Sequence, residues 1–281
     1  MIYNTVEVEA PGFGEKAKLY IWSLGNYQEM RLNQKRPLVL VCPGGAYGFV
    51  SEKEGEPLAI RFLSMGYHVA LLEYSVHPQV KYPVELLQLA NAVNYLKKHA
   101  KEYNINPDKI IIQGSSAGGH LAGSFGCFWN KRWLREAIGV EEGYLRPAGL
   151  ILNYPVITSG EKAHHDSFYN LLGERYEELK EEMSLEKQVT QDVPRTFLWH
   201  TVTDDLVPVE NSILFAQALI EQGVSVELHL YPVGGHGLAL ANYETQSADG
   251  YGIQPEVQSW ADLAKTWLKF YNDYNEECEE M

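Results

Sequence analysis

Short apolar runs alternate with longer amphipathic segments along most of the chain. The runs are bounded by turn residues and lie at 37–42, 68–74, 109–113, 148–153, 196–200 and 224–231. Continuous apolar runs of this length are typical of strands that are buried on both faces. Because amphipathic segments fill the intervals, the pattern predicts a mostly parallel sheet with helices on both faces.

The intervals between the runs carry helix signals. A helix over about 55–65 is expected to stop at Gly66, since glycine readily takes the left-handed conformation beyond a helix C-terminus. Pro83 is placed to open a longer helix that ends near Lys101. Loose alternation over residues 1–35 predicts an antiparallel start to the sheet. Further helices are expected after the stretch 114–118, where 119–122 is helix-like, over about 209–223 and over about 255–274, whereas the acidic insert 156–194 is expected to be irregular.

The stretch Gly114-Ser115-Ser116-Ala117-Gly118 separates the run at 109–113 from a helix-like segment. A G-x-S-x-G pattern between a strand and a helix is typical of a nucleophile elbow, a sharp turn that exposes the serine Oγ. The helix N-terminus directs free N–H groups toward a developing negative charge. Centring the pattern on Ser116 keeps both flanking glycines, whereas centring it on Ser115 loses both. The sequence therefore predicts Ser116 as a nucleophile.

A serine hydroxyl needs a base to accept its proton and a carboxylate to orient that base. His236 lies in Gly-Gly-His-Gly after the last predicted strand, and two adjacent carboxylates, Asp204 and Asp205, follow the strand before it. Loops at the carboxyl ends of parallel strands are where such groups are expected. The residues alone leave the choice between Asp204 and Asp205 open.

Together these stretches resemble the serine esterases of the α/β-hydrolase superfamily, in the branch related to hormone-sensitive lipases and acetyl-xylan esterases. The resemblance spans about residues 37–270 and is carried by residues 43–47, 73–78, 114–118, 200–208 and 235–236. In this family the acid of the triad lies four residues before a proline, which selects Asp204 as the partner of His236. The resemblance implies a three-layer α/β/α sandwich with a mostly parallel sheet of about eight strands. We expect a single domain over 1–281, with a small cap or lid insert over 156–194.

The resemblance also implies an oxyanion hole, the set of N–H groups that binds the negative oxygen of the transition state. Where the lipase branch has His-Gly-Gly-Gly, this chain has Pro43-Gly44-Gly45-Ala46. The expected donors are the backbone N–H groups of Gly45, Ala46 and Ala117. Tyr47 and Tyr74 are expected either to line a substrate pocket or to pack in the core. The arginine of the relatives' Asp-Tyr-Arg stretch is Ser75 here, which favours the shorter-capped sugar-ester deacetylases.

Composition narrows the range of partners and cofactors. A net charge of −14 disfavours nucleic acid and anionic membranes, because phosphate binding requires a basic face. The three cysteines form neither a disulfide framework nor a C-x-x-C metal site, and they fit a reducing cytoplasm. The N-terminus resembles no signal peptide, and no apolar run reaches membrane-spanning length. The sequence leaves open whether the chain forms a homo-oligomer.

Other histidines offer weaker chemistry. His164-His165-Asp166 lacks a third ligand at helical spacing, so we expect neither a metal nor any cofactor. His200 is expected to cap its strand. His120, one helical turn after Ser116, is expected to pack through hydrogen bonds, with a place on the floor of the site as the alternative.

These patterns predict a serine carboxylic-ester hydrolase that acts through an acyl-enzyme. The resemblance favours the removal of acetyl groups from sugars or xylo-oligosaccharides, so the expected partner is a small-molecule ester. Alternatives within the hydrolases are a short-chain lipase or carboxylesterase and a peptidase of the prolyl-oligopeptidase type. The peptidases carry a large N-terminal propeller, for which this chain has no room. An alternative of another class is a binding protein that has lost catalysis, yet all three residues of the triad are present.

Overall fold

The computed structural model describes residues 1–27, 29 and 35–270. The described residues form one sheet of eight strands: β1 (Ile2–Glu9), β2 (Lys16–Ser23), β3 (Arg36–Cys42), β4 (His68–Glu73), β5 (Ile105–Ser115), β6 (Gly149–Asn153), β7 (Thr196–Thr201) and β8 (Val226–Tyr231). Their spatial order is β1-β2-β4-β3-β5-β6-β7-β8. β2 pairs antiparallel with both β1 and β4, and every other neighbouring pair is parallel. The predicted mostly parallel sheet with an antiparallel start is therefore confirmed.

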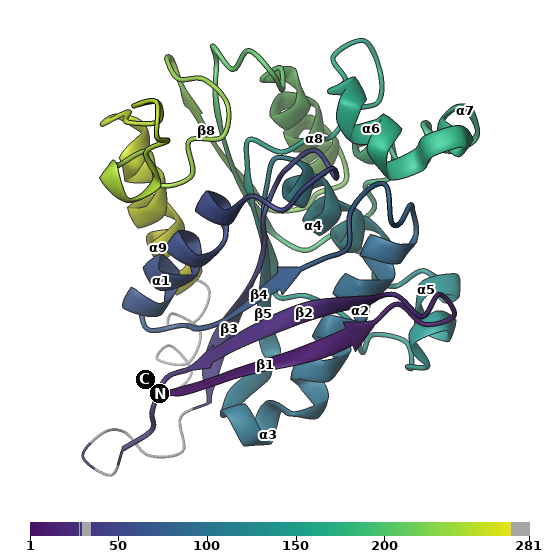
Figure 1. The fold of residues 1–281 in the computed structure, drawn as a ribbon, viewed down its shortest axis with the longest axis vertical. Helices are drawn as coiled ribbons and strands as arrows, with labels where there is room; N and C mark the ends of the chain where they lie inside the picture. The colour runs from purple at the N-terminus through teal and green to yellow at the C-terminus, as the bar shows by residue number, and fades with distance from the viewer. Residues whose placement is uncertain (28, 30–34, 271–281) are drawn as a thin grey trace.

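Helices cover both faces of this sheet (Figure 1). The α-helices are α1 (Glu56–Ser64), α2 (Val84–Lys98), α3 (Ala100–Tyr103), α4 (Ala117–Phe128), α5 (Arg132–Ile138), α6 (His165–Leu172), α7 (Tyr176–Leu179), α8 (Glu210–Glu221) and α9 (Trp260–Phe270). Short 3-10 helices are η1 (Glu52–Glu54), η2 (Gly173–Arg175), η3 (Leu185–Lys187), η4 (Tyr243–Thr245) and η5 (Val257–Ser259). α1 and α9 lie on one side of the sheet and α2, α4 and α8 on the other, which gives the three layers of an α/β-hydrolase fold.

Two expected elements differ from the structure, and one helix of the structure was not expected. The insert 156–194 was expected to be irregular, but it contains α6 and α7 with short 3-10 turns, because its acidic stretches also hold helix formers and local ion pairs. The last helix was expected over 255–274. Its first regular turn begins at Trp260 after a 3-10 turn, and residues 271–274 lie outside the described residues. α5 has no counterpart among the expected helices.

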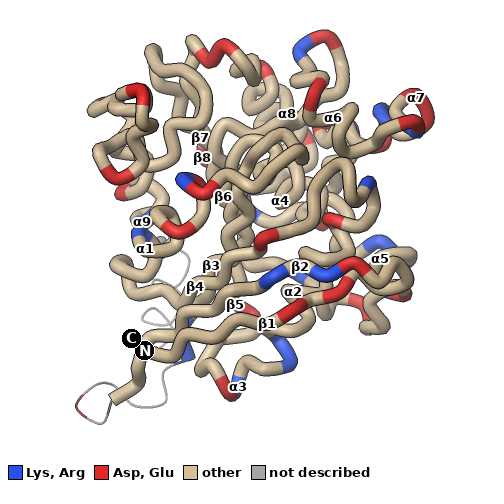
Figure 2. The backbone as a smooth tube through the Cα atoms, viewed as in Figure 1, with Lys and Arg blue, Asp and Glu red and all other residues tan. Residues whose placement is uncertain are grey.

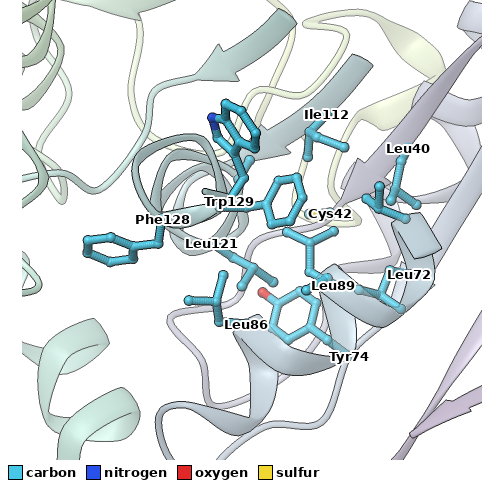
Figure 3. Close-up of a cluster of buried hydrophobic side chains, with 14 of the residues drawn as sticks. Leu40, Cys42, Leu72, Tyr74, Leu86, Leu89, Ile112, Leu121, Phe128 and Trp129 are labelled. Atoms are coloured by element: carbon cyan, nitrogen blue, oxygen red, sulfur yellow. The ribbon is translucent and has the colours of Figure 1, made fainter. Parts of the chain in front are cut away.

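Alternate residues of each central strand face two separate hydrophobic clusters. Leu38 and Leu40 of β3 face the cluster shared with α2, α4 and α8, whereas Val39 and Val41 face the cluster shared with α1 and α9. Figure 3 shows part of the first cluster, in which Cys42 and Tyr74 pack against side chains of α2 and α4. Burial on both faces explains why these strands have continuous apolar runs.

Charged residues lie mainly on the outer helices and loops, with both signs interspersed (Figure 2). In the acidic stretch around α7, Glu177, Glu178 and Glu181 pair with nearby basic side chains. These pairs are largely exposed, so each contributes little to stability. Among the described residues, no helix has both the length and the apolar character that a membrane span requires.

Glu85, in the first turn of α2, is a carboxyl group buried in the core. It is 1% exposed, and neither carboxyl oxygen bonds to another described residue. Burial raises the pKa of Glu85 from 4.5 to about 8. Between these two values the folded chain holds a proton that the unfolded chain releases. The stability that this proton contributes is present below about pH 4.5 and is lost as the pH rises through 8.

The substitution Glu85→Gln should therefore flatten the pH dependence of stability. We expect the melting temperature of the wild type to fall relative to that of the variant as the pH rises from 5 to 9, because the amide cannot ionise. Thermal unfolding at a series of pH values measures this difference. Parallel curves for the two proteins would contradict a neutral Glu85 in the folded state.

Candidate active site

Ser116 occupies the sharp turn between β5 and α4. Its backbone adopts φ +54° and ψ −121°, a conformation that stores about 1–3 kcal/mol of strain in a residue with a side chain. Two backbone hydrogen bonds fix the turn. Ser116 N–H donates to the Asn153 carbonyl at 3.0 Å, and Val156 N–H donates to the Ser116 carbonyl at 3.1 Å. The loop after β6 therefore holds the serine in the geometry of a nucleophile elbow.

Close backbone contacts require the two glycines of the elbow. A Cβ on Gly118 would overlap the carbonyl oxygens of Cys42 and Pro43. A Cβ on Gly114 would overlap the carbonyl oxygen of Gly118. The first turn of α4 thus lies directly against the ends of β3 and β5. A side chain at Gly118 would separate the helix from β3, and one at Gly114 would separate it from β5.

His236 connects Ser116 to Asp204. The His236 Nε2 atom lies 2.7 Å from Ser116 Oγ, and its Nδ1 atom lies 2.7 Å from Asp204 Oδ2. The carboxylate can only accept, so Nδ1 carries a proton and Nε2 is free to accept the proton of the hydroxyl. The structure therefore brings together the three residues that the sequence proposed as nucleophile, base and acid.

Asp204 is held by more than the histidine of the triad. Its Oδ1 atom accepts hydrogen bonds from the backbone N–H groups of Leu206 at 3.0 Å and Val207 at 2.9 Å. His200 Nε2 lies 3.3 Å from Asp204 Oδ2. Burial would raise the pKa of Asp204, but the hydrogen bonds with His200 and His236 outweigh burial and hold the pKa well below its usual range. Asp204 is therefore a fixed carboxylate.

Asp205 lies on the other side of this turn. It is exposed and lines an open cavity of about 440 Å³ beside His236. The structure thus places Asp204, and not its neighbour, against His236 Nδ1. The choice that the resemblance made between two adjacent carboxylates agrees with this geometry.

The His236 loop (residues 232–241) follows β8 and is tied down on both sides. Thr203 Oγ1 donates to the Gly234 carbonyl and accepts from the Gly234 N–H, both at 2.9 Å. Tyr251 donates its hydroxyl to the His236 carbonyl at 2.8 Å. The ring of Tyr154 packs edge-on against the imidazole of His236, with ring centroids 5.1 Å apart. The base is therefore fixed in position before any substrate binds.

The glycine loop (residues 43–47) lies beside the nucleophile. A Cβ on Gly44 would lie 2.8 Å from Ser116 Cβ, and Gly44 N–H already donates to Glu54 Oε2 at 2.9 Å. No described residue accepts a hydrogen bond from the N–H of Gly45 or of Ala46. Ala117, the first residue of α4, has no intrahelical acceptor for its N–H. The three donors expected from the sequence are thus free to bind an oxyanion.

The glycine loop has an unusual backbone that its neighbours stabilise. Ala46 and Tyr47 both have positive φ, at +54° and +57°, which residues with side chains rarely adopt. Asn170 of α6 donates to the Ala46 carbonyl at 2.8 Å, and His77 N–H donates to the Tyr47 carbonyl at 2.8 Å. Hydrogen bonds from outside the loop therefore maintain a strained conformation.

The expectation that Tyr47 and Tyr74 line a substrate pocket needs correction. Their side chains are 1% and 2% exposed and pack against each other in the core. Tyr74 donates its hydroxyl to the Pro43 carbonyl, and Tyr47 donates its hydroxyl to His120 Nδ1. Both tyrosines are therefore core residues, which is the alternative stated for them above. Tyr74 thereby holds Pro43 at the start of the glycine loop, and the bond with His120 anchors Tyr47 at its end.

His120 is a buried packing residue, as its first interpretation held. Its Nε2 atom lies 2.9 Å from the Met183 carbonyl, which assigns the ring proton to Nε2 and leaves Nδ1 to accept from Tyr47. Burial lowers the pKa of His120 to about 4, so the ring is neutral. His164 bonds to Ser167, and the described residues contain no cluster of three or more side chains suited to a metal ion.

Sequence analysis missed four residues that shape the site: Glu54, Tyr154, Asn170 and His200, the last of which was expected only to cap a strand. Glu54, Tyr154 and Asn170 contact a loop or a side chain of the site from distant parts of the chain, and none of the three lies in a motif with fixed spacing. His200 contacts Asp204 from within the same short stretch. Only His200 carried a usable signal, because it lies four residues before Asp204.

Comparisons with known proteins agree with this geometry. A family model described as BD-FAE matches residues 25–219. The chain is 39% identical over 219 residues to endo-1,4-beta-xylanase B of Butyrivibrio fibrisolvens. That match covers 75% of this chain and 34% of the relative. It is also 29% identical over 215 residues to the acetylxylan esterase of Xylanibacter ruminicola. That match covers 73% of this chain and 42% of the relative. The chain thus spans less than half of either curated relative.

Several solved structures superpose on nearly the whole chain. A carboxylesterase from Lactobacillus plantarum WCFS1 superposes with a TM-score of 0.84 at 26% identity, covering 96% of this chain and 97% of the other. An acetyl ester-xyloside bifunctional hydrolase from Caldicellulosiruptor lactoaceticus gives a TM-score of 0.80 at 33% identity, with 96% and 97% covered. Fold and relatives together define an α/β-hydrolase of the serine-esterase class. Within that class, the chain belongs to the BD-FAE family.

The substitution Gly118→Ala should damage both stability and activity. Its Cβ would overlap backbone atoms that cannot rotate away, so we expect a loss of about 1–3 kcal/mol of unfolding free energy and a lower kcat. Thermal unfolding and hydrolysis of p-nitrophenyl acetate measure the two effects. Gly160→Ala is the matched control, because its Cβ would meet only the side chain of Thr158, at 3.2 Å. Equal behaviour of the two variants would contradict the packing described for the elbow.

Asparagine substitutions separate the roles of the two adjacent carboxylates. Asp204→Asn should lower kcat by about 10⁴-fold, because an amide N–H₂ facing Nδ1 favours the wrong tautomer of His236. Asp205→Asn should leave kcat within about threefold of the wild type, since solvent-exposed substitutions away from such contacts have small effects. Steady-state hydrolysis of p-nitrophenyl acetate checks both values. A larger loss in the Asp205 variant would reverse the assignment.

Proposed function

We propose that the protein hydrolyses carboxylic esters through an acyl-enzyme formed on Ser116. The observation that carries the proposal is the continuous row of hydrogen bonds from Ser116 through His236 to Asp204, with 2.7 Å at each step. The row lies beside free N–H groups of the glycine loop and of α4. Such an arrangement can activate a serine and stabilise an oxyanion at the same time.

In the acylation step, Ser116 Oγ attacks the ester carbonyl carbon while His236 Nε2 accepts the hydroxyl proton. The carbonyl oxygen becomes negative and binds the N–H groups of Gly45, Ala46 and Ala117. Each such donor stabilises the transition state by about 3–4 kcal/mol in comparable enzymes. His236 then protonates the leaving alcohol as the tetrahedral intermediate collapses to the acyl-enzyme. Asp204 stabilises the imidazolium that forms during these steps.

In the deacylation step, water replaces the alcohol. His236 Nε2 accepts a proton from the water as its oxygen attacks the acyl carbon. The second tetrahedral intermediate uses the same N–H donors. Its collapse breaks the bond to Ser116 Oγ, which takes the proton back from His236 and releases the carboxylic acid. Water and the residues named above supply every proton and oxygen that the two steps use.

An acetylated sugar or xylo-oligosaccharide is the substrate that we propose. Support comes from the names of two relatives, an acetylxylan esterase and an acetyl ester-xyloside hydrolase. The cavity beside His236 gives further support. It is lined by polar groups such as Asp205 and Gln254 together with apolar groups such as Leu206 and Val233. Such a lining suits a sugar, whose ring faces are apolar and whose rim carries hydroxyl groups.

Residues 156–194 are proposed to cap the site within a single domain. Asn170 contacts the glycine loop, and the Met183 carbonyl contacts His120 beneath it. The sparse cysteines support a cytoplasmic setting as part of the same proposal. Such a setting would suit a short oligosaccharide better than polymeric xylan.

The decisive experiment combines one substitution with a substrate series. Acetate release from acetylated xylo-oligosaccharides and hydrolysis of C2–C8 p-nitrophenyl esters should be measured for the wild type, Ser116→Ala and Ser124→Ala. We expect Ser116→Ala to lose at least about 10⁴-fold in kcat, since the nucleophile is gone. Ser124, a buried serine of α4 whose Oγ has no partner among the described residues, is the matched control.

The outcomes separate the alternatives. Activity that survives in Ser116→Ala would refute the mechanism. An inactive wild type would favour a binding protein with this fold. A preference for C6–C8 esters over acetyl esters would keep the mechanism and replace the sugar acetate with the substrate of a short-chain lipase.

A further inference from the structure

Glu54 is a buried carboxylate that lies between the two loops of the site. It belongs to η1, is 3% exposed, and forms no ion pair with any described residue. Its Oε2 atom accepts the Gly44 N–H at 2.9 Å, and its Oε1 atom accepts the Tyr154 hydroxyl at 2.7 Å. With one donor on each oxygen, the site fits an ionised carboxylate. Burying a carboxylate without a counterion is unfavourable, so its position calls for a reason.

Tyr154 extends this contact to the other loop. Its hydroxyl donates to Glu54 and accepts the Ala239 N–H at 2.9 Å, while its ring packs edge-on against His236. The side chain is 1% exposed, and burial together with Glu54 raises the pKa of Tyr154 well above its usual range. The Tyr154 hydroxyl therefore keeps its proton near neutral pH and can donate it to Glu54.

The contacts form one continuous chain from Gly44 through Glu54 and Tyr154 to Ala239. Gly44 lies in the glycine loop, next to the expected oxyanion donors, and Ala239 lies in the His236 loop, three residues after the base. We propose that Glu54 and Tyr154 are positioning residues that set the distance between the oxyanion donors and the base. This inference rests on the proposed esterase function.

Transition-state chemistry explains why such a connection matters. Acylation needs the base within reach of Ser116 Oγ and the N–H donors within reach of the carbonyl oxygen at the same moment. The two loops are about 190 residues apart in sequence, as the positions of Gly44 and His236 show, so only tertiary contacts can fix their spacing. A misplacement of about 1 Å can lower the rate by about 100-fold. The ester in its ground state needs neither contact strongly, so KM should depend little on this connection.

Glu54→Gln tests the carboxylate with almost no change in shape. The amide keeps one acceptor oxygen but places an N–H₂ group against either Gly44 N–H or the Tyr154 hydroxyl. We expect kcat for p-nitrophenyl acetate to fall by about 100-fold while KM stays within threefold. The reason is that a shift of the loops weakens transition-state stabilisation, whereas the ground-state ester binds as before. Glu85→Gln is the matched control, since Glu85 is equally buried and has no partner on another described residue. It should change stability and leave kcat unchanged.

Tyr154→Phe tests the hydroxyl and keeps the ring on His236. We expect kcat to fall by about tenfold with KM unchanged, since Ala239 N–H and Glu54 both lose a partner. Tyr103→Phe removes the hydroxyl of another buried tyrosine, which bonds to Asn4 far from the loops in sequence, and should leave kcat unchanged. The double variant of Glu54 and Tyr154 should lose much less than the product of the single losses, because both residues act in one chain of contacts.

Labelling of Ser116 by a fluorophosphonate probe gives a readout that is independent of the ester. The rate of labelling should fall in parallel with kcat in Glu54→Gln and Tyr154→Phe, and not in the controls. If the wild type labels but hydrolyses no ester, the proposed function fails, and the labelling rates alone decide the inference.

Three results would overturn the inference. One is a folded Glu54→Gln variant with kcat or labelling within threefold of the wild type. Another is an equal loss in Glu54→Gln and Glu85→Gln, which would indicate general damage. If Glu54→Gln does not fold, the test passes to Tyr154→Phe. Unchanged kcat and labelling rates in that variant would be the third result that overturns the inference. A wild type that neither labels nor hydrolyses esters would refute both the function and this inference.

Discussion

The close packing of α4 against the ends of β3 and β5 is the constraint on which the site depends. Gly118 allows the first turn of the helix to touch the carbonyl groups of Cys42 and Pro43, and the strained turn at Ser116 lies directly before this contact. Hydrogen bonds to the loop after β6 keep the strain in place. Ser116 and the next residue, Ala117, therefore lie beside the glycine loop, where a Cβ on Gly44 would come within 2.8 Å of Ser116 Cβ. A looser junction would separate these groups and leave no common place for an ester carbonyl.

The parallel sheet brings the remaining groups to that junction. β5, β6, β7 and β8 are neighbours and run in the same direction, so the loops after them meet at one edge (Figure 1). Ser116 follows β5, Tyr154 follows β6, Asp204 follows β7 and His236 follows β8. The hydrogen bond from the Ser116 N–H to the Asn153 carbonyl joins the ends of β5 and β6, and the hydrogen bond between His236 and Asp204 joins the loops after β8 and β7. The central strands β3, β6 and β7 are buried on both faces, so they form a rigid frame for the strained turns that follow the strands.

The features that the sequence predicted share one property: a short motif with a local physical reason. The elbow was predictable because strand, turn and helix are consecutive, and the alternation of strands and helices was predictable because burial on both faces leaves long apolar runs. The roles of Glu54 and Tyr154 were not predictable, because they meet across 100 residues through one hydrogen bond. Tyr47 and Tyr74 were ambiguous for a similar reason, since an aromatic residue near a motif fits a pocket and a core equally well. Only packing decides between them.

The insert 156–194 is coupled to the glycine loop, and this affects how it can act as a cap. Ala46 and Tyr47 adopt a backbone that is unfavourable in isolation, so it persists only while outside contacts hold it. The insert supplies the hydrogen bond from Asn170 to the Ala46 carbonyl and the Met183 carbonyl that orients His120 beneath Tyr47. A large opening of the insert would break both contacts and release the strained loop. In the proposed role of the insert as a cap, access to the site and the shape of the glycine loop are therefore linked, because the same segment supplies both contacts.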